Sequence, residues 1–68
     1  MKGSYPITLS DNPEAHAAWL RSSMSRRFDV IRAYITPAGY VRVLGVNRSD
    51  GTVTRYYYNP RLGRWMRS

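Results

Sequence analysis

The spacing of apolar residues changes near Phe28, and the two spacings predict two kinds of secondary structure. Ala17, Leu20, Met24 and Phe28 recur at three- and four-residue intervals, which places them on one stripe of a helix. After Phe28, segments rich in β-branched and aromatic residues have the apolar spacing of half-buried strands. The pattern therefore predicts a helix that is followed by a sheet.

The residues before this stripe carry the signals of a helix start. Asp11 can cap the helix, Glu14 can complete a capping box three residues later, and Pro13 suits the first turn. Arginines near the end of the segment match the negative pole of the helix dipole. We expect a helix within residues 10–28 and, over residues 1–9, a flexible N-terminal arm or a short edge segment, of which we favour the arm.

Three extended segments follow the helix. They are VIRAYIT, YVRVLGVN and TVTRYYYN, and the connections between them, TPAGY and RSDGT, carry glycine at the same point. Each connection is typical of a type I turn that ends in a left-handed glycine, Gly39 or Gly51, and makes a three-residue hairpin loop. A further turn that ends at Gly63 predicts a short fourth strand over residues 64–67.

These elements predict an α+β fold, with one N-terminal helix packed on a three- to four-stranded antiparallel β-meander. The length of 68 residues limits the chain to one small domain, which we place at residues 10–68.

The hairpin loops fix which residues pair, and the pairing assigns each side chain to one face of the sheet. The face expected to pack against the helix holds Ile31, Ala33, Ile35, Val41, Val43, Gly45, Val53, Tyr57 and Trp65. The face expected to meet solvent holds Arg32, Tyr34, Arg42, Leu44, Val46, Tyr56, Tyr58, Arg64 and Met66. A slip of one residue in the second hairpin would exchange the two faces of the third strand.

The net charge of the chain indicates what kind of partner it can bind. Eleven lysine and arginine residues face four aspartate and glutamate residues, which gives a net charge of +7. Such a charge attracts polyanions, and ten of the eleven basic residues are arginines, whose planar forks suit phosphate and carboxylate groups. We therefore expect an acidic partner, which is nucleic acid, an anionic membrane surface or an acidic protein.

Tyrosines and arginines neighbour one another on the face expected to meet solvent. The candidate binding residues are Arg32, Tyr34, Arg42, Tyr56, Tyr58 and Arg64. Such a face suits single-stranded nucleic acid, because bases stack on aromatic rings at about 1–3 kcal/mol each while guanidinium groups neutralise phosphates. The same residue types are also frequent in protein interfaces and on ordinary solvated sheets. The sequence leaves these three interpretations open.

Residues suited to catalysis are scarce. The single histidine, His16, has no second histidine, cysteine or carboxylate pair at useful spacing, and Asp11, Glu14 and Asp50 are expected to serve a cap and a turn. The chain has no cysteine, and no glycine-rich phosphate loop occurs. We expect a protein that is not an enzyme and that uses no cofactor, metal or small-molecule substrate.

The segment GTVTRYYYNPRLGRW, residues 51–65, resembles the YD hairpin repeat of Rhs-type proteins. That repeat has tyrosine and aspartate, a few variable residues, and then glycine, arginine and an aromatic residue. Asn59 stands where the family has aspartate, and the chain holds no second copy. The resemblance implies a hairpin over these residues and implies no function.

In size, charge and compactness the chain resembles the small regulators that phages encode to redirect host transcription by binding RNA polymerase. The resemblance implies a non-enzymatic regulator that binds and inhibits a nucleic-acid-handling protein such as RNA polymerase. The alternative is a domain that binds single-stranded nucleic acid through the tyrosine and arginine face. We expect a monomer in the cytoplasm, or in the host cytoplasm if the protein is phage-encoded. No segment approaches the roughly 20 apolar residues of a membrane span.

Overall fold

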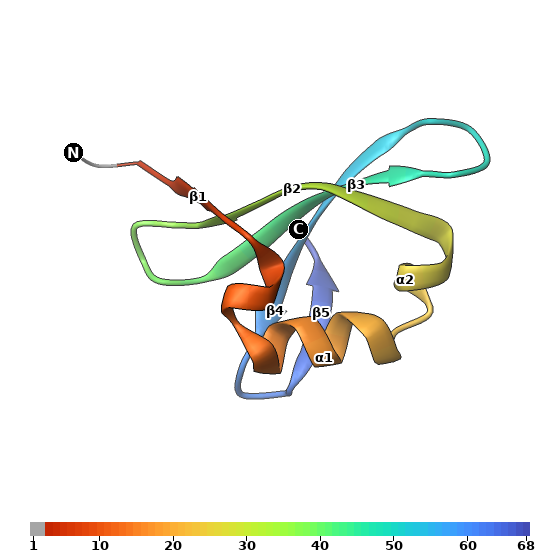
Figure 1. The fold of residues 1–68 in the computed structure, drawn as a ribbon. Coiled ribbons are helices and arrows are strands. Elements are labelled where there is room, and N and C mark those ends of the chain that lie inside the picture. The colour runs from red at the N-terminus through yellow and green to blue at the C-terminus, as the bar shows by residue number, and fades with distance from the viewer. Residues whose placement is uncertain (1–2) are drawn as a thin grey trace.

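Five antiparallel strands form one sheet, in chain order, in the computed structural model, which describes residues 3–68 (Figure 1). The strands are β1 (Tyr5–Ile7), β2 (Phe28–Ile35), β3 (Val41–Asn47), β4 (Val53–Asn59) and β5 (Arg64–Arg67). The helices are a 3-10 turn η1 (Leu9–Asp11) and the α-helices α1 (Pro13–Arg21) and α2 (Met24–Arg27). The α+β prediction is confirmed, but the sheet has five strands in place of three or four, and two α-helices replace the single one expected.

The extra strand lies in the expected arm. Residues 5–7 form β1 and pair with β2, so this part of the segment 1–9 is a sheet edge, whereas Met1 and Lys2 lie outside the described residues. No helix within residues 3–68 is long and apolar enough to cross a membrane.

The predicted helix is interrupted at its serines. The Ser22 hydroxyl donates a hydrogen bond to the Trp19 carbonyl at 2.6 Å, and Ser22 takes an extended backbone that ends α1. Asn12 is the N-cap of α1, since its side chain accepts a hydrogen bond from the Ala15 amide, and the predicted cap by Asp11 with Glu14 is wrong. Asp11 instead accepts a hydrogen bond from the Thr8 amide at the start of η1.

The predicted apolar stripe is confirmed only at its C-terminal end. Phe28 is buried and Met24 packs against the core, whereas Ala17 is exposed and Leu20 is 62% exposed. Within α1 the buried residues are Ala15, Ala18 and Trp19, so α1 packs on the sheet through a different face from the one predicted.

Near its loop the first hairpin pairs as predicted, since the Gly39 amide bonds to the Thr36 carbonyl and Ile35 lies opposite Val41. The expected pairing of Ile31 with Gly45 is wrong, because a bulge places Val30 opposite Gly45. The next two hairpins have four-residue loops. In each, a glycine amide donates to the carbonyl of an asparagine four residues earlier, Gly51 to Asn47 and Gly63 to Asn59. Each pairing of β4 is therefore shifted by one residue from the prediction.

Side-chain hydrogen bonds stabilise these two loops. The Asn47 side chain accepts a hydrogen bond from the Ser49 amide, and the Asn59 side chain accepts one from the Arg61 amide. The Asp50 carboxylate accepts hydrogen bonds from the Thr52 amide and hydroxyl, which lower the pKa of Asp50 below its ordinary value.

The shift exchanges the two faces of β4. Tyr56 now lies opposite Val43 and is 6% exposed, and Tyr58 lies opposite Trp65 and is 5% exposed, so both belong to the core. The expected solvent-facing position of Tyr56 and Tyr58 is therefore wrong, and Tyr57 takes that position.

Two further predicted core residues are exposed. A β-bulge between Val30 and Arg32 leaves Ile31 59% exposed, and the shift of β4 leaves Val53 57% exposed. The predicted burial of Ala33, Val41, Val43, Gly45 and Trp65 is confirmed.

Aromatic side chains join α1 to the sheet. Trp65 donates a buried hydrogen bond from Nε1 to the Ala15 carbonyl at 2.8 Å. Trp19 packs edge-on against both Trp65 and Tyr56, with ring centroids 5.4 and 5.7 Å apart. Phe28 packs edge-on against Tyr56 and lies over Gly45, where a Cβ would come within 3.2 Å of the Phe28 Cβ. The helices therefore cover one face of the sheet (Figure 1).

Three consecutive tyrosines of β4 test this register. Tyr56→Ala and Tyr58→Ala should each lower the free energy of unfolding by about 3 kcal/mol or more, because each removes a buried ring. Tyr57→Ala, the matched control, should lower it by about 1 kcal/mol or less. Urea denaturation measures all three, and a larger loss for Tyr57→Ala than for its neighbours would contradict the register.

Candidate functional site

The face of the sheet opposite the helices carries aligned tyrosines and arginines. One row of paired residues runs Pro6, Tyr34, Arg42, Tyr57, Met66, and the next runs Arg32, Leu44, Arg55. We call the surface formed by these two rows the outer face.

Two hollows of similar composition lie on the outer face. The first, of about 480 Å³, is lined by Ser4, Tyr5, Pro6, Arg32, Tyr34, Leu44 and Arg55. The second, of about 430 Å³, is lined by Tyr40, Arg42, Tyr57, Asn59, Pro60 and Arg61. Each hollow thus has two tyrosines and two arginines, and no carboxylate of residues 3–68 lines either one.

In the first hollow, Arg32 and Arg55 lie on either side of Leu44, one strand away from it in each direction. Neighbouring strands are about 4.8 Å apart, so the two arginine backbones are about 10 Å apart. Both arginine side chains are long enough to reach an anion held above Leu44. Tyr34 and Tyr5 supply the aromatic wall beside it.

In the second hollow, Tyr40 and Tyr57 pack edge-on, with ring centroids 6.5 Å apart. Arg42 enters from the adjacent strand, between Tyr34 and Tyr57 in the row of paired residues. The Nε atom of Arg42 is shielded from solvent and has no hydrogen-bond partner within residues 3–68. Arg61, in the loop before β5, completes the hollow.

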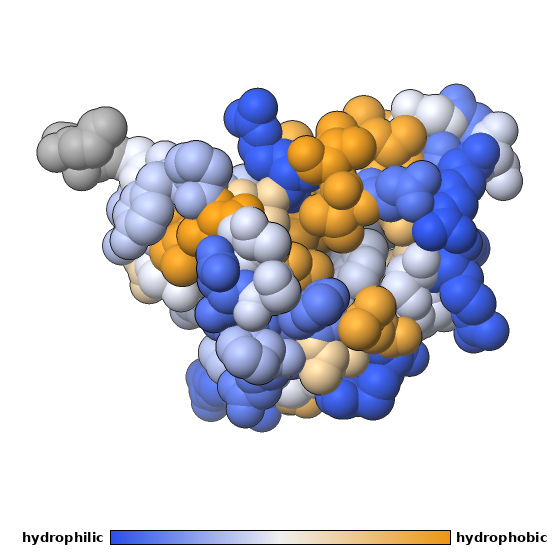
Figure 2. All heavy atoms as spheres, in the orientation of Figure 1, coloured by the Kyte–Doolittle hydropathy of each residue, from blue (hydrophilic) through white to orange (hydrophobic). Residues whose placement is uncertain are grey.

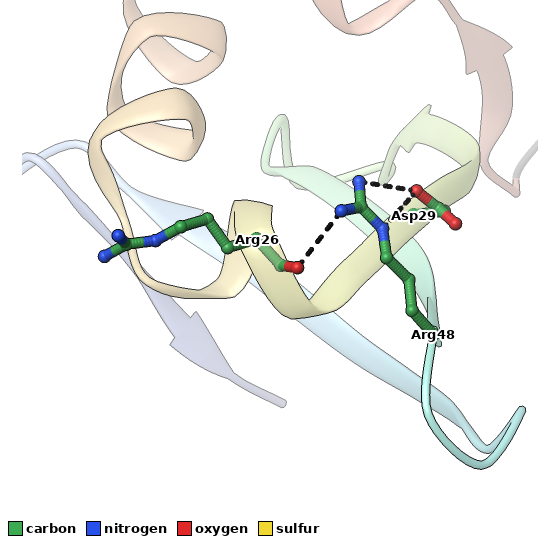
Figure 3. Close-up of polar contacts among 3 residues, drawn as sticks. All are labelled: Arg26, Asp29 and Arg48. Carbon is green, nitrogen blue, oxygen red and sulfur yellow. Dashed lines mark hydrogen bonds and ion pairs between the residues drawn. The ribbon is translucent and has the colours of Figure 1, made fainter.

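The acidic residue at the end of this face is already paired. Asp29 alternates with the buried Phe28 and therefore points to the outer side. There its Oδ1 accepts a hydrogen bond from Nε of Arg48 and forms an ion pair with Nη2 of Arg48, both at 2.8 Å (Figure 3). Arg48 Nη1 also donates to the Arg26 carbonyl at 3.1 Å, which ties the β3–β4 loop to α2. Asp29 is therefore neutralised by Arg48, and no carboxylate of the described residues lines the hollows to neutralise their arginines.

Hydrophobic side chains also reach the surface near the two rows. Figure 2 shows apolar side chains on the sheet side of the molecule, with hydrophilic side chains around them. Ile31 and Val53 are the exposed large aliphatic residues of the central strands. An exposed surface with aromatic rings, aliphatic groups and positive charges can hold flat, anionic ligands by stacking and by ion pairing.

The predicted binding residues are only partly brought together. Arg32, Tyr34 and Arg42 lie on the outer face, and Arg64 lies at its margin on β5. Tyr56 and Tyr58 are in the core and cannot contact a ligand on this face.

Sequence reasoning missed Tyr57 and Arg55, which occupy the outer face after the one-residue shift. It also missed Tyr5, Tyr40 and Arg61, which come from an edge strand and two loops. The repeated spacing Asn-x-x-x-Gly, in NRSDG and NPRLG, was the available signal for the shift.

Nothing in the described part of the chain groups three histidine, cysteine or carboxylate residues where they could hold a metal ion. No protein-family model, curated protein or solved structure was found to match this chain. The resemblances to YD repeats and to phage regulators therefore stay predictions.

Arg42 provides a test of what this residue does for the fold. Arg42→Met keeps the apolar stem and removes a shielded donor, so the free energy of unfolding should stay within about 1 kcal/mol or rise. Arg42→Ala also removes the stem and should lower it by about 1 kcal/mol or more. Thermal or urea unfolding compares the two variants. Equal losses for both would show that the guanidinium itself holds the fold together.

Proposed function

We propose that this protein is a non-enzymatic module that binds single-stranded nucleic acid on its outer face. The observation that carries the proposal is the pair of hollows, each with two tyrosines, two arginines and no lining carboxylate among residues 3–68. Unstacked bases supply flat rings for the tyrosines, and the phosphates between them supply charge for the arginines.

The arrangement of the hollows supports a strand that crosses the sheet. Arg42, which lines the second hollow, lies between Tyr34 of the first hollow and Tyr57 of the second. Consecutive bases could then use different tyrosines while the intervening phosphate meets Arg42. Stacking at about 1–3 kcal/mol per base would add to the electrostatic attraction of a chain with net charge +7.

The expected regulator that inhibits RNA polymerase stays a prediction. The positive charge suits an acidic protein as well as nucleic acid, but the paired tyrosine and arginine hollows favour a ligand with alternating rings and phosphates. The two proposals differ in how binding depends on salt, because counterion release from phosphates makes nucleic-acid affinity fall steeply as salt rises.

Fluorescence anisotropy with labelled oligothymidylate and oligouridylate tests the proposal. Tyr34→Ala combined with Tyr57→Ala should weaken binding at least about tenfold, because it removes one stacking ring from each hollow. Arg32→Ala combined with Arg55→Ala should also weaken binding. If each arginine contacts one phosphate, this variant should reduce the slope of log affinity against log salt by about 1.4.

The matched control is Arg21→Ala combined with Arg26→Ala, which loses the same charge on the helices. This control should retain most of the affinity and should keep the salt slope of the parent protein. Equal losses in the control and in the Arg32 and Arg55 variant would mean that net charge alone attracts the oligonucleotide. Absence of binding at low salt would contradict the proposal outright.

A further inference from the structure

β5 is an edge strand of the sheet, and no strand of residues 3–68 pairs with its outer side. The Ser68 amide donates a hydrogen bond to the Arg55 carbonyl at 3.0 Å, which fixes which residues of β5 bond to β4. Bonding directions alternate along an antiparallel strand, so Trp65 and Arg67 direct their amides and carbonyls away from β4. These groups can pair with a sixth strand.

The opposite edge is less suited to pairing. β1 has three residues, and its central residue is Pro6, which has no amide hydrogen to donate. β5 has four residues and no proline. A strand that joins this sheet would therefore find more hydrogen-bond partners at β5.

A groove of about 470 Å³ runs beside the free edge of β5. It is lined by Ala18, Arg21, Ser22, Met24, Gly63, Arg64, Trp65, Met66 and Arg67. Ala18, Trp65 and the two methionines give it an apolar surface, while Arg21, Arg64 and Arg67 are exposed at its sides. No carboxylate of the described residues lines the groove.

We propose that β5 binds an extended acidic segment of a partner protein as an additional antiparallel or parallel strand. The partner backbone would bond to the outward amides and carbonyls of Trp65 and Arg67. Its side chains would alternate between the two faces of the sheet. Those on the helix side would meet Trp65 and Arg67, and those on the outer side would meet Arg64 and Met66, with aspartate or glutamate residues opposite the arginines.

The positive charges of the groove favour an acidic peptide strand over a second copy of this chain, and the free strand edge favours it over nucleic acid. A second copy of the chain pairing through β5 would bring Arg64 and Arg67 of one copy against those of the other, which like-charge repulsion opposes. Nucleic acid would satisfy the arginines but lacks a peptide backbone to continue the β-ladder. This surface is separate from the outer-face hollows, so the proposal does not depend on nucleic-acid binding.

Defined peptides test the proposal. The probe is a synthetic peptide in which valine and threonine alternate with glutamate. A peptide of identical sequence with N-methyl groups on alternate amides, tested in both phases of alternation, is the control. N-methylation keeps the charge and removes backbone donors, so one of the two methylated peptides should bind at least about tenfold more weakly. Hydrogen exchange followed by NMR should show slower exchange of the Trp65 and Arg67 amides when the unmethylated peptide is bound.

Protein variants locate the site. Arg64→Glu combined with Arg67→Glu should weaken binding of the acidic peptide at least about tenfold. The matched control, Arg26→Glu combined with Arg27→Glu, makes the same change of charge on α2, outside the groove lining, and should keep affinity within about twofold. Arg64→Gln with Arg67→Gln should weaken binding to an intermediate degree, and circular dichroism checks that each variant is folded.

Equal binding by the unmethylated peptide and both methylated peptides would overturn the proposal, because attraction of charge alone would then explain the complex. Equal losses in the two glutamate variants would overturn it for the same reason. If the acidic peptide does not bind at all, the arginines of β5 serve to prevent strand pairing and the proposal fails.

Discussion

The packing of Trp65 against α1 determines which face of the sheet the helices cover and which face stays exposed to a ligand. The indole Nε1 reaches the Ala15 carbonyl at 2.8 Å from a strand fifty positions further along the chain, and the hydrogen bond is buried. Trp19 then fits edge-on between Trp65 and Tyr56. A small domain has little core, so a few aromatic rings provide much of the buried area. Since these rings hold the helices on one face, the tyrosines and arginines of the other face are left without a covering element.

The distribution of charge follows from this arrangement. Arg48 neutralises Asp29 and ties the β3–β4 loop to α2, so this arginine serves the fold. The other acids lie in η1, α1 and a hairpin loop, and none of them lines either hollow, although Glu14 lines a neighbouring pocket with Tyr40 and Pro60 of the second hollow. Arginines on the outer face and beside β5 therefore keep their charge available to a ligand. The same excess of arginine supports two separate proposals, a nucleic-acid strand across the sheet and an acidic strand at its edge.

The sequence predicted the fold class and the first hairpin, because Thr36 to Tyr40 has a loop length that one glycine identifies. It failed at β4, where Tyr56, Tyr57 and Tyr58 are consecutive. Either register places tyrosine on both faces, so hydrophobicity could not choose between them. The register of β4 is instead determined by the length of its two loops. That length is set by Asn47 and Asn59, whose carbonyls accept hydrogen bonds from the glycine amides. The strand β1 was only an alternative to a flexible arm, because three residues around a proline give no alternating pattern. Arg32, Tyr34 and Arg42 were placed correctly because the first hairpin fixes β2 and β3 together.

The central claim is that the face opposite the helices binds single-stranded nucleic acid. Photo-crosslinking to an oligonucleotide that contains 5-iodouridine, followed by mass-spectrometric mapping of the crosslinked residues, tests it most directly. We expect crosslinks to the tyrosines of the two hollows, above all Tyr34 and Tyr57, and none to the buried Tyr56 and Tyr58. Crosslinks confined to α1 and α2, or crosslinks to Tyr56 and Tyr58 in place of Tyr57, would contradict it.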